Sequence, residues 1–392
     1  WAGGKLRRVS SMGGDARIIP FSIADDRVII DATHPAVEVA PDSFETKMPR
    51  WAEVSPDGGT VVFETLGKLW LKPAAGGTAR RLTAAKDNAF ELWPSWSRDG
   101  KSVVFVRWTD AGLGEIHIAG RGGGSSRKIT ASPGHYAEPR FSPDGKLIAF
   151  EKRSGGGLRS ERWGDNPGIY RIAVSGGAAE RVSDNGAKPQ FGAASDRIFM
   201  IASADSKNQL ISTDLHGQDR RVHASGELVS DYEVSPDGRT LAFRQNYDAY
   251  VTPLMPGGQD VSLSTSGGPM PVTRVSGSGA DYVHWSDGGK RLHWTRGPTL
   301  FSADLGSFFA SAPAAGEDKP AKFVPPTSGV SLAMTAPVAK HKGTVVITGA
   351  RIVTMADADG GIIDNGAIVI EGDRITAVGP AGAIAVPAGA VT

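Results

Sequence analysis

The stretch "WAEVSPDGGTVVFE", from Trp51 to Glu64, contains the pattern that decides the fold. Four residues that alternate in polarity precede Ser-Pro-Asp-Gly, and a β-branched and aromatic run follows it. Proline presets φ for the first central position of a turn, aspartate accepts local backbone hydrogen bonds, and glycine takes the positive φ that closes a hairpin. The stretch therefore predicts two antiparallel strands joined by a tight turn.

The same pattern recurs along the chain. The further copies are "WPSWSRDGKSVVFV" from Trp93, "EPRFSPDGKLIAFE" from Glu138, "KPQFGAASDRIFMI" from Lys188, "DYEVSPDGRTLAFR" from Asp231 and "DYVHWSDGGKRLHW" from Asp281. Successive starting residues lie 42 to 50 positions apart, and a third and a fourth strand follow each copy. Four antiparallel strands per repeat, six times over, are typical of a β-propeller. A β-sandwich rich in such turns is the alternative, but sandwiches do not repeat at this period.

The composition is that of a soluble globular protein, with 40% apolar and 22% charged residues among 392. The 51 glycines and 25 prolines are spread along the chain, which indicates frequent turns. A net charge of +1 gives no support for a nucleic-acid partner. The absence of cysteine excludes disulfides, thiolate zinc sites and a cysteine nucleophile. No apolar stretch approaches the roughly 18 residues of a membrane span, so none is expected.

We expect the propeller to occupy residues 41–310. Residues 1–40 contain strand-like segments that are either part of a blade that completes the ring or the remnant of an upstream propeller. Residues 311–342 are rich in proline and are predicted to be a linker, with "VSLAMTAPV" able to supply an edge strand. Since Trp1 is not a natural first residue, we also expect further chain upstream.

The repeated F/W-S-P-D-G-K/R core resembles the repeat of TolB-type propellers, also known as the PD40 repeat. The resemblance covers roughly residues 50 to 305. It implies the fold, whereas propellers serve as binding platforms, gates and scaffolds alike.

Residues 343–392 form a different segment. "TVVITGARIVTM" predicts two strands around Gly349, and "GAIVIEGDRITAVGP" predicts a hairpin with its tight turn at Glu371-Gly372-Asp373-Arg374. Fifty residues of this kind cannot bury a core alone, so they must pair with more chain or pack against the propeller.

This closing segment resembles the small β-sandwich at the start of metal-dependent amidohydrolases of the imidazolonepropionase and dihydroorotase kind. The matching residues are Ile347 to Thr354, Ile368 to Gly379 and Val386 to Ala390. The resemblance implies a partial sandwich, followed beyond this chain by a TIM barrel with a His-x-His pair and a divalent metal, for which zinc is expected. It implies that the partner of this chain is its own missing barrel or another chain that carries one, with a homo-oligomer possible. It also implies a bacterial periplasmic or secreted location.

No catalytic, cofactor-binding or metal-ligating residue can be assigned in the chain itself. None of the eight histidines shows His-x-His or H-E-x-x-H spacing, and a G-x-S-x-G nucleophile elbow is absent. His284 and His293 are the best histidine pair, and their simpler interpretation is as partly exposed strand residues. An insertion at 153–168 offers Arg162, Trp163 and Asp165 as contact candidates, although a plain surface loop is the favoured interpretation.

Two functions remain open. One is the non-catalytic propeller part of an amidohydrolase of amide or cyclic amide bonds, which gates access to the barrel or acts as a scaffold. The other is a TolB-like periplasmic binding or scaffold propeller without enzymatic activity. The residues that follow Thr392 distinguish them.

Overall fold

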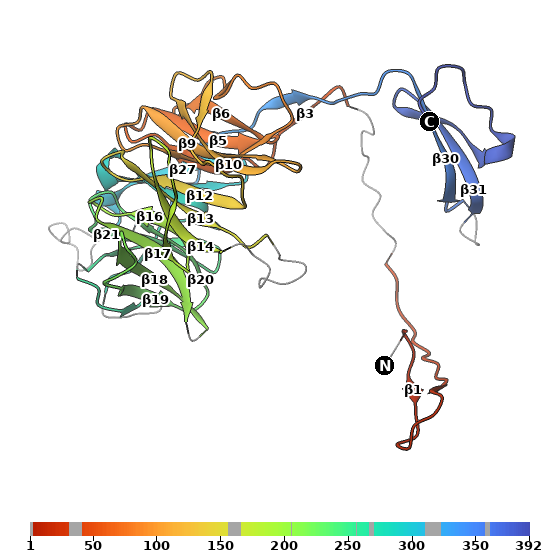
Figure 1. Ribbon diagram of the computed structural model, residues 1–392, viewed down its shortest axis with the longest axis horizontal. Coiled ribbons are helices and arrows are strands. Elements are labelled where there is room, and N and C mark those ends of the chain that lie inside the picture. Colours follow the sequence, from red (N-terminus) through yellow and green to blue (C-terminus); the bar gives the residue numbers. More distant parts are fainter. Residues whose placement is uncertain are drawn as a thin grey trace. The chain divides into compact units, whose positions relative to one another are not determined.

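The computed structural model describes residues 3–30, 41–155, 166–204, 206–255, 257–265, 270–309, 323–356 and 361–392 (Figure 1). Two compact units divide the chain. One is the propeller, Ser43–Val338, and the other comprises Trp1–Asp42 and Ala339–Thr392. Among the described residues, no helix is both long and apolar enough to cross a membrane.

Among the described residues, the propeller consists of six sheets, each with four antiparallel strands in chain order from the channel outward. The sheet of blade 4 has a fifth strand, β23 (Val261–Ser262), which pairs in parallel with its outermost antiparallel strand. Blade 1 comprises β4 (Arg50–Val54), β5 (Thr60–Thr65), β6 (Lys68–Pro73) and β7 (Arg80–Arg81). Blade 2 comprises β8 (Phe90–Trp96), β9 (Ser102–Thr109), β10 (Leu113–Gly120) and β11 (Ser126–Lys128). Blade 3 comprises β12 (Tyr136–Phe141), β13 (Leu147–Lys152), β14 (Gly168–Ala173) and β15 (Glu180–Ser183). Blade 4 comprises β16 (Ala187–Phe191), β17 (Arg197–Ala204), β18 (Lys207–Asp214) and β19 (Arg221–Gly226). Blade 5 comprises β20 (Val229–Val234), β21 (Thr240–Gln245), β22 (Asp248–Pro253) and β24 (Thr273–Arg274). Blade 6 comprises β25 (Asp281–Ser286), β26 (Arg291–Arg296), β27 (Thr299–Asp304) and β28 (Val330–Ser331). The predicted all-β propeller of six repeats is confirmed.

The turns between the first two strands follow the predicted chemistry. In the first repeat, Ser55 Oγ donates to Asp57 Oδ1 at 2.5 Å and accepts from the Thr60 amide at 3.0 Å. Gly58 has a φ of 73°, as the turn requires. The fourth repeat has lost this motif, and β16 and β17 pair there all the same.

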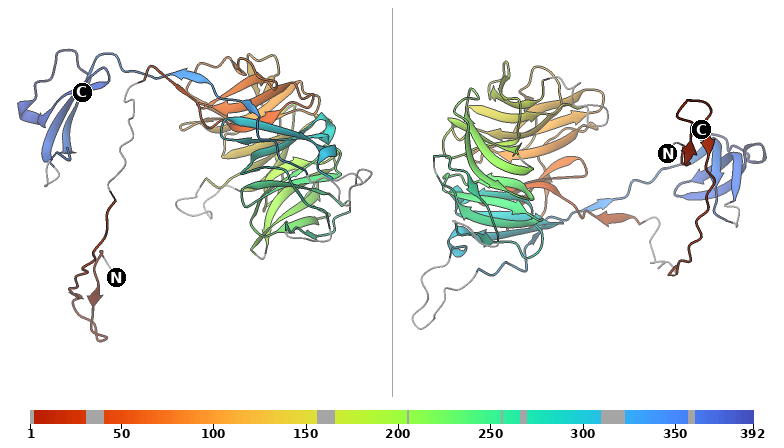
Figure 2. Two further views of the ribbon diagram at one scale, coloured as in Figure 1. Left: turned by 180° about the vertical axis from the view of Figure 1, so that it is seen from behind. Right: turned by 90° about the horizontal axis from the view of Figure 1, so that it is seen from below.

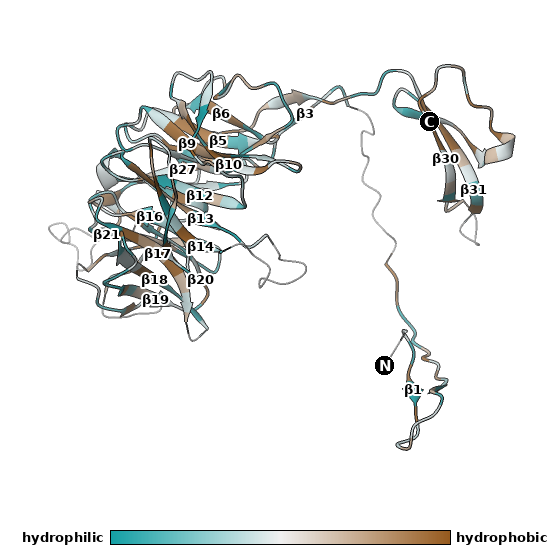
Figure 3. Cartoon of the chain, viewed as in Figure 1, coloured by the Kyte–Doolittle hydropathy of each residue, from teal (hydrophilic) through white to brown (hydrophobic). Residues whose placement is uncertain are grey.

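The core is a ring of hydrophobic clusters, one at each of the six junctions between neighbouring sheets. Figure 2 shows the sheets of the propeller from two further sides, and Figure 3 colours their hydrophobic residues brown. At the junction of blades 6 and 1, Leu300 and Leu332 pack against Val54 and Phe63, and all four side chains are buried. The apolar faces of the sheets are therefore covered only when the ring closes on itself.

Blade 6 takes its fourth strand from Val330–Ser331, which pairs with β27. This strand comes from the proline-rich segment in which the sequence predicts a linker with an edge strand. Lys72 of blade 1 donates to the Ser331 carbonyl at 2.7 Å, so the strand also ties the last blade to the first. Residues 7–18 form a separate hairpin, β1 (Arg7–Arg8) with β2 (Arg17–Ile18), and take no part in this sheet.

Five of the six innermost strands carry the same β-bulge, in which two residues lie opposite one residue of the second strand. The first bulge residue has a positive φ between 48° and 53° in each case: Trp51, Trp93, Glu138, Lys188 and Tyr282. The bulge turns the strand so that the residue two positions later faces the neighbouring blade. In the sixth repeat the bulge aligns Tyr282 with Trp51, so the repeat starts one residue later than the sequence pattern suggested.

These later residues connect neighbouring blades by hydrogen bonds. Glu53 Oε1 of blade 1 accepts from the Trp96 amide of blade 2 at 2.9 Å. Gln190 Oε1 of blade 4 accepts from the Val234 amide of blade 5 at 2.7 Å. Each bond satisfies a strand amide that points away from its own sheet and toward the preceding blade. We call these side-chain contacts the inner latches.

The inner latch at the ring closure is a histidine. His284 Nε2 of blade 6 accepts from the Val54 amide of blade 1 at 2.8 Å, and Nδ1 lies 2.7 Å from the Tyr282 carbonyl. The two contacts require the neutral ring with its proton on Nδ1. Burial lowers the pKa of His284 to about 4, which keeps the ring neutral at physiological pH.

The second unit contains a three-stranded antiparallel sheet of β30 (Thr344–Val353), β31 (Ile362–Glu371) and β32 (Arg374–Pro380). Gly349, with a φ of 68°, lies at a register shift inside β30, so one bent strand replaces the two that the sequence predicts. The hairpin at Glu371 and Arg374 is confirmed. Several apolar side chains of this sheet are exposed, including Ile347, Ile362, Ile375 and Val378.

We predict that the contribution of Leu332, the residue after β28, to ring closure can be measured with matched leucine substitutions. Leu332→Ala removes a fully buried side chain and should lower the free energy of unfolding by about 2–5 kcal/mol. Leu228→Ala, at a side chain that is 73% exposed, should change it by less than about 0.5 kcal/mol. Urea denaturation followed by tryptophan fluorescence measures both, and equal effects would contradict the packing of Leu332 in the cluster that closes the ring.

The ring-closing histidine predicts acid sensitivity. Because the folded state depresses the pKa of His284 from 6.5 to about 4, the unfolded state binds more protons between these values, and stability should fall as pH falls from about 6.5 to about 4. The loss attributable to this residue is up to about 3 kcal/mol.

His284→Gln provides the matched variant, because Gln190 makes the equivalent latch in blade 4. It should keep most of the neutral-pH stability and show a smaller loss on acidification, whereas His284→Leu should be destabilised at every pH. Denaturation midpoints measured at pH 7, 5.5 and 4.5 compare the three proteins. An equal acid loss in the wild type and His284→Gln would show that His284 is not the titrating latch.

Candidate functional site at the mouth of the channel

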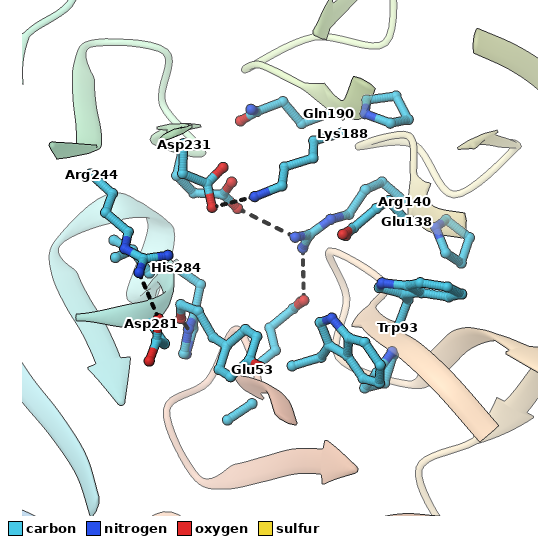
Figure 4. A pocket seen from close by; sticks show the side chains of 18 residues that line it. Glu53, Trp93, Glu138, Arg140, Lys188, Gln190, Asp231, Arg244, Asp281 and His284 are labelled. Atoms are coloured by element: carbon cyan, nitrogen blue, oxygen red, sulfur yellow. Dashed lines mark hydrogen bonds and ion pairs between the residues drawn. The ribbon is translucent and has the colours of Figure 1, made fainter. Parts of the chain in front are cut away.

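The innermost strands of all six blades line a central channel. At the end where these strands begin, it opens into a mouth of about 190 Å³ (Figure 4). A second cavity of about 110 Å³ continues along the channel and shares Glu53, Arg140, Gln190, Glu233 and His284 with the mouth. Figure 4 shows Arg140, Glu138 and Lys188 on one side of the mouth and Arg244, Asp281 and His284 on the other.

The bulges direct their first residues to the mouth. Trp51, Trp93, Glu138, Lys188 and Tyr282 all line it. A positive φ in a bulky residue other than glycine is uncommon and costs of order 1–3 kcal/mol. Backbone strain of this kind is concentrated at functional sites and persists where the surrounding structure imposes it. Repeated strain around one opening therefore marks the mouth as the strongest candidate site.

Five carboxyl groups and three cationic side chains line the mouth. Lys188 Nζ lies 2.7 Å from Asp231 Oδ2, and Arg244 Nη2 lies 3.1 Å from Asp281 Oδ1. Glu138 is different, because no ion pair or hydrogen bond to its carboxylate occurs among the described residues. Burial raises the pKa of Glu138, although Arg140 and Lys188 oppose the shift.

Arg140 spans the channel from blade 3. Its Nη1 lies 2.7 Å from Glu53 Oε2 of blade 1, and its Nη2 lies 3.7 Å from Glu233 Oε1 of blade 5. Burial works against the charged guanidinium, but Glu233 and Glu53 raise the pKa of Arg140 above its usual value. Burial raises the pKa of Glu233 to about 8, with Arg140 acting in the opposite direction. The nearer carboxylate, Glu53, is therefore the main ion-pair partner of Arg140.

A second arginine crosses the channel at its other end. Arg98 donates to the Pro236 carbonyl at 3.0 Å and to the Gly192 carbonyl at 3.1 Å, and thus links blade 2 to the turns of blades 4 and 5. In the repeat pattern Arg98 stands where three other copies have proline, "SRDG" in place of "SPDG". Arginine in place of proline at this turn position is the sequence signal for its role, although the turn pattern alone does not predict it.

The structure describes the two candidate histidines but not the three contact candidates of the insertion. His284 and His293 stack with ring centroids 5.1 Å apart, and both are buried rather than partly exposed. His293 Nε2 and Nδ1 contact the hydroxyls of Ser286 and Ser302 at 2.8 and 2.6 Å. Both histidines therefore have structural partners within their sheet and its neighbour. Arg162, Trp163 and Asp165 lie outside the described residues.

The metal chemistry of the amidohydrolase resemblance does not fit this part of the chain. Among the described residues, no group of three or more histidine, aspartate or glutamate side chains is arranged to hold a metal ion. The two stacked histidines have their ring nitrogens engaged by Val54, Tyr282 and two serines. We therefore derive no metal-dependent step from these residues.

Comparison with known proteins places the repeats in one family. The model of the TolB β-propeller domain, PD40, matches residues 48–255, just over half of the chain. An uncharacterized protein of Agrobacterium fabrum is 29% identical over 39% of this chain and 50% of its own length. The Tol-Pal system protein TolB of Bordetella pertussis is 43% identical over 17% of this chain and 14% of its own length. The matches thus span half or less of these curated relatives.

Among solved structures, TolB from Acinetobacter baumannii is similar over 70% of this chain and 60% of its own, at 19% identity and a TM-score of 0.43. The family match covers all of blades 1 to 4 and the first three strands of blade 5, including four of the five strained bulge residues. The chain belongs to the PD40 family of TolB β-propeller domains.

Proposed function

We propose that this propeller is a binding platform whose channel mouth takes a positively charged side chain of a partner protein. The observation that carries this proposal is Glu138, the mouth carboxylate without a partner among the described residues. It is held on a strained bulge at a φ of 49°, beside an opening with more carboxylates than cations. A cation from a partner supplies the missing charge.

Aromatic rings at the mouth support the same ligand chemistry. Trp51 and Trp93 have ring centroids 5.1 Å apart, and Tyr282 also lines the opening. The Arg50 guanidinium lies 6.0 Å from the Trp51 ring, and that of Arg153 lies 5.2 Å from the Trp93 ring. These rings therefore already attract cationic groups, as their negative faces predict.

The size of the mouth indicates what enters it. Sites for whole small molecules usually measure about 300–1,000 Å³. The mouth, at about 190 Å³, is below that range and suits one inserted side chain. A partner protein that presents a lysine or arginine at its surface fits better than a free metabolite.

A bacterial periplasmic or secreted location belongs to this proposal. It is supported by the likeness to TolB of Bordetella pertussis, which is by name a protein of the Tol-Pal system. The partner and the location are proposed for this chain on that likeness and on the chemistry of the mouth.

We predict that peptides selected on the full chain from a displayed library carry a basic residue at a fixed position. Glu138→Gln should weaken their binding about tenfold, since it removes the unpaired charge, and higher salt should weaken wild-type binding. Titration by isothermal calorimetry measures both effects.

Glu227→Gln is the matched control, because Glu227 is an exposed glutamate outside the mouth. It should leave binding unchanged. Selection of acidic or purely apolar peptides, or equal binding by Glu138→Gln, would contradict the proposal.

A second candidate is that residues 343–392 open a metal-dependent amidohydrolase, with the propeller gating or supporting its barrel. The specific observation in favour is the sheet β30–β32, which leaves Ile347, Ile362, Ile375 and Val378 exposed. A sheet with uncovered apolar side chains needs further chain or a partner to bury them. The strands of this sheet resemble the amidohydrolase sandwich, and in that family the chain continues into a TIM barrel.

The gene sequence beyond the codon for Thr392 tests this second candidate. We predict an open frame that continues through a D-x-H-x-H motif, because the sandwich precedes a barrel strand with that motif in the resembling family. A natural stop codon directly after Thr392 would overturn it.

A further inference from the structure

The sheet of β30, β31 and β32 has one covered face. Residues directly opposite each other in an antiparallel pair lie on the same face of a sheet. Val346, Val369 and Ala377 are opposite one another on the three strands, and the first two are buried. Gly379 lies two residues beyond Ala377, on the same face, and a Cβ added to it would lie 3.3 Å from Ile384 Cδ1. The tail that follows β32 therefore lies against this face.

The opposite face of the sheet carries two rows of apolar side chains that run across the three strands. The rows are Val345, Ile370 and Ile375, and then Ile347, Ile368 and Val378. None of the six side chains is buried, and Ile375 is 63% exposed. This face is thus a continuous apolar surface that no described residue covers.

The N-terminal segment has a complementary apolar surface. Its hairpin pairs β1 with β2, and the Ile19 amide donates to the Leu6 carbonyl at 2.9 Å, so these two opposite side chains lie on one side. The alternation in "IPFSI", residues 19–23, places Phe21 and Ile23 on the side of Ile19 in an extended strand. All four side chains are exposed. Because a two-stranded hairpin is marginally stable alone in water, it also needs a layer on which to pack.

The chain keeps these two surfaces close to each other. Both belong to one compact unit, and Asp42 forms an ion pair with Lys340 at 2.8 Å. Ile30 is twelve residues from Asp42, and Thr344 is four residues from Lys340. Twelve residues span up to about 40 Å, which exceeds the length of a strand such as β30, at about 3.3 Å per residue. The ion-paired ends thus hold the hairpin within reach of the sheet, at an effective concentration of order millimolar.

We propose that the N-terminal segment, residues 6–23, docks on the uncovered face of this sheet as the second layer of a β-sandwich. Leu6, Ile19, Phe21 and Ile23 pack on the two apolar rows, at the separation of about 10 Å that packed sheets adopt. The contact buries apolar surface that neither layer buries alone. A second copy of the chain presents the same segment, but the short connection favours the segment of the same chain.

This inference is separate from both proposed functions. The mouth of the channel is lined by residues of the propeller, and docking of the hairpin requires no residue beyond Thr392. Its failure would leave the peptide selection with Glu138→Gln and the reading of the gene to decide those proposals.

Hydrogen–deuterium exchange of the full chain, followed by mass spectrometry of its peptides, tests the docking. Phe21→Asp places a charge in the proposed contact and should speed exchange in β31 and β32 about tenfold, because the docked layer stabilises the sheet. Met12→Asp is the matched control, since Met12 lies in the turn of the same hairpin and is 94% exposed. It should leave exchange of the sheet unchanged. Equal exchange in the wild type and Phe21→Asp would overturn the inference.

Paired cysteines identify what occupies the face. The chain has no cysteine of its own, so Ile23→Cys combined with Ile375→Cys gives one reactive pair. A short bismaleimide should link this pair within one chain. It should link Ile23→Cys several-fold less to Val386→Cys, in the exposed part of the tail that follows β32.

The full chain, mixed from ¹⁵N-labelled and unlabelled protein, distinguishes links within one chain from links between two. Links between labelled and unlabelled peptides would show that a second copy occupies the face and would overturn docking within the chain. Equal linking of the two cysteine pairs would also overturn it, since the segment would then be near the sheet without a fixed contact.

Discussion

The β-bulge at the start of the innermost strands is the constraint on which the rest of the propeller depends. Two residues face one residue of the second strand, and the first of the two is held at a positive φ. The residue opposite is a large, buried side chain in each case: Phe63, Phe105, Phe150, Met200 and Trp294. Burial of that side chain in the ring-shaped core offsets the strain of the bulge. The repeated core thus fixes the geometry of the channel.

The bulge divides the channel residues into two roles. Its first residue faces the mouth, where Glu138 and the tryptophans are available to a partner. The residue two positions later is used in the structure itself, as Glu53, Gln190 and His284 show by accepting an amide from the next blade. Ser95 and Arg140 are the exceptions. Ser95 Oγ donates to Glu53 Oε1 at 3.3 Å, and Arg140, which cannot accept a hydrogen bond, pairs with Glu53 as well. Charge in the channel therefore has a structural function as well as a proposed binding function.

Much of the fold could be predicted from the sequence because it is encoded locally. Serine, aspartate and glycine at fixed positions specify each turn, and their hydrogen bonds recur where the motif is intact. The bulges could not be predicted, since tryptophan, glutamate and lysine do not prefer a positive φ, and only packing between blades imposes it. An edge strand within "VSLAMTAPV" was predicted, but its place in blade 6 was not, because Val330–Ser331 pairs with β27 only when the ring closes.

The most direct test of this account is the hydrogen bond that closes the ring. In protein labelled with ¹⁵N, a coupling across this bond between the Val54 amide nitrogen and His284 Nε2 can be measured by NMR, and the imidazole nitrogen shifts report the tautomer. The account predicts a detectable coupling and a neutral ring with its proton on Nδ1. Absence of the coupling, together with a proton on Nε2, would contradict the latch and with it the proposed closure of the ring.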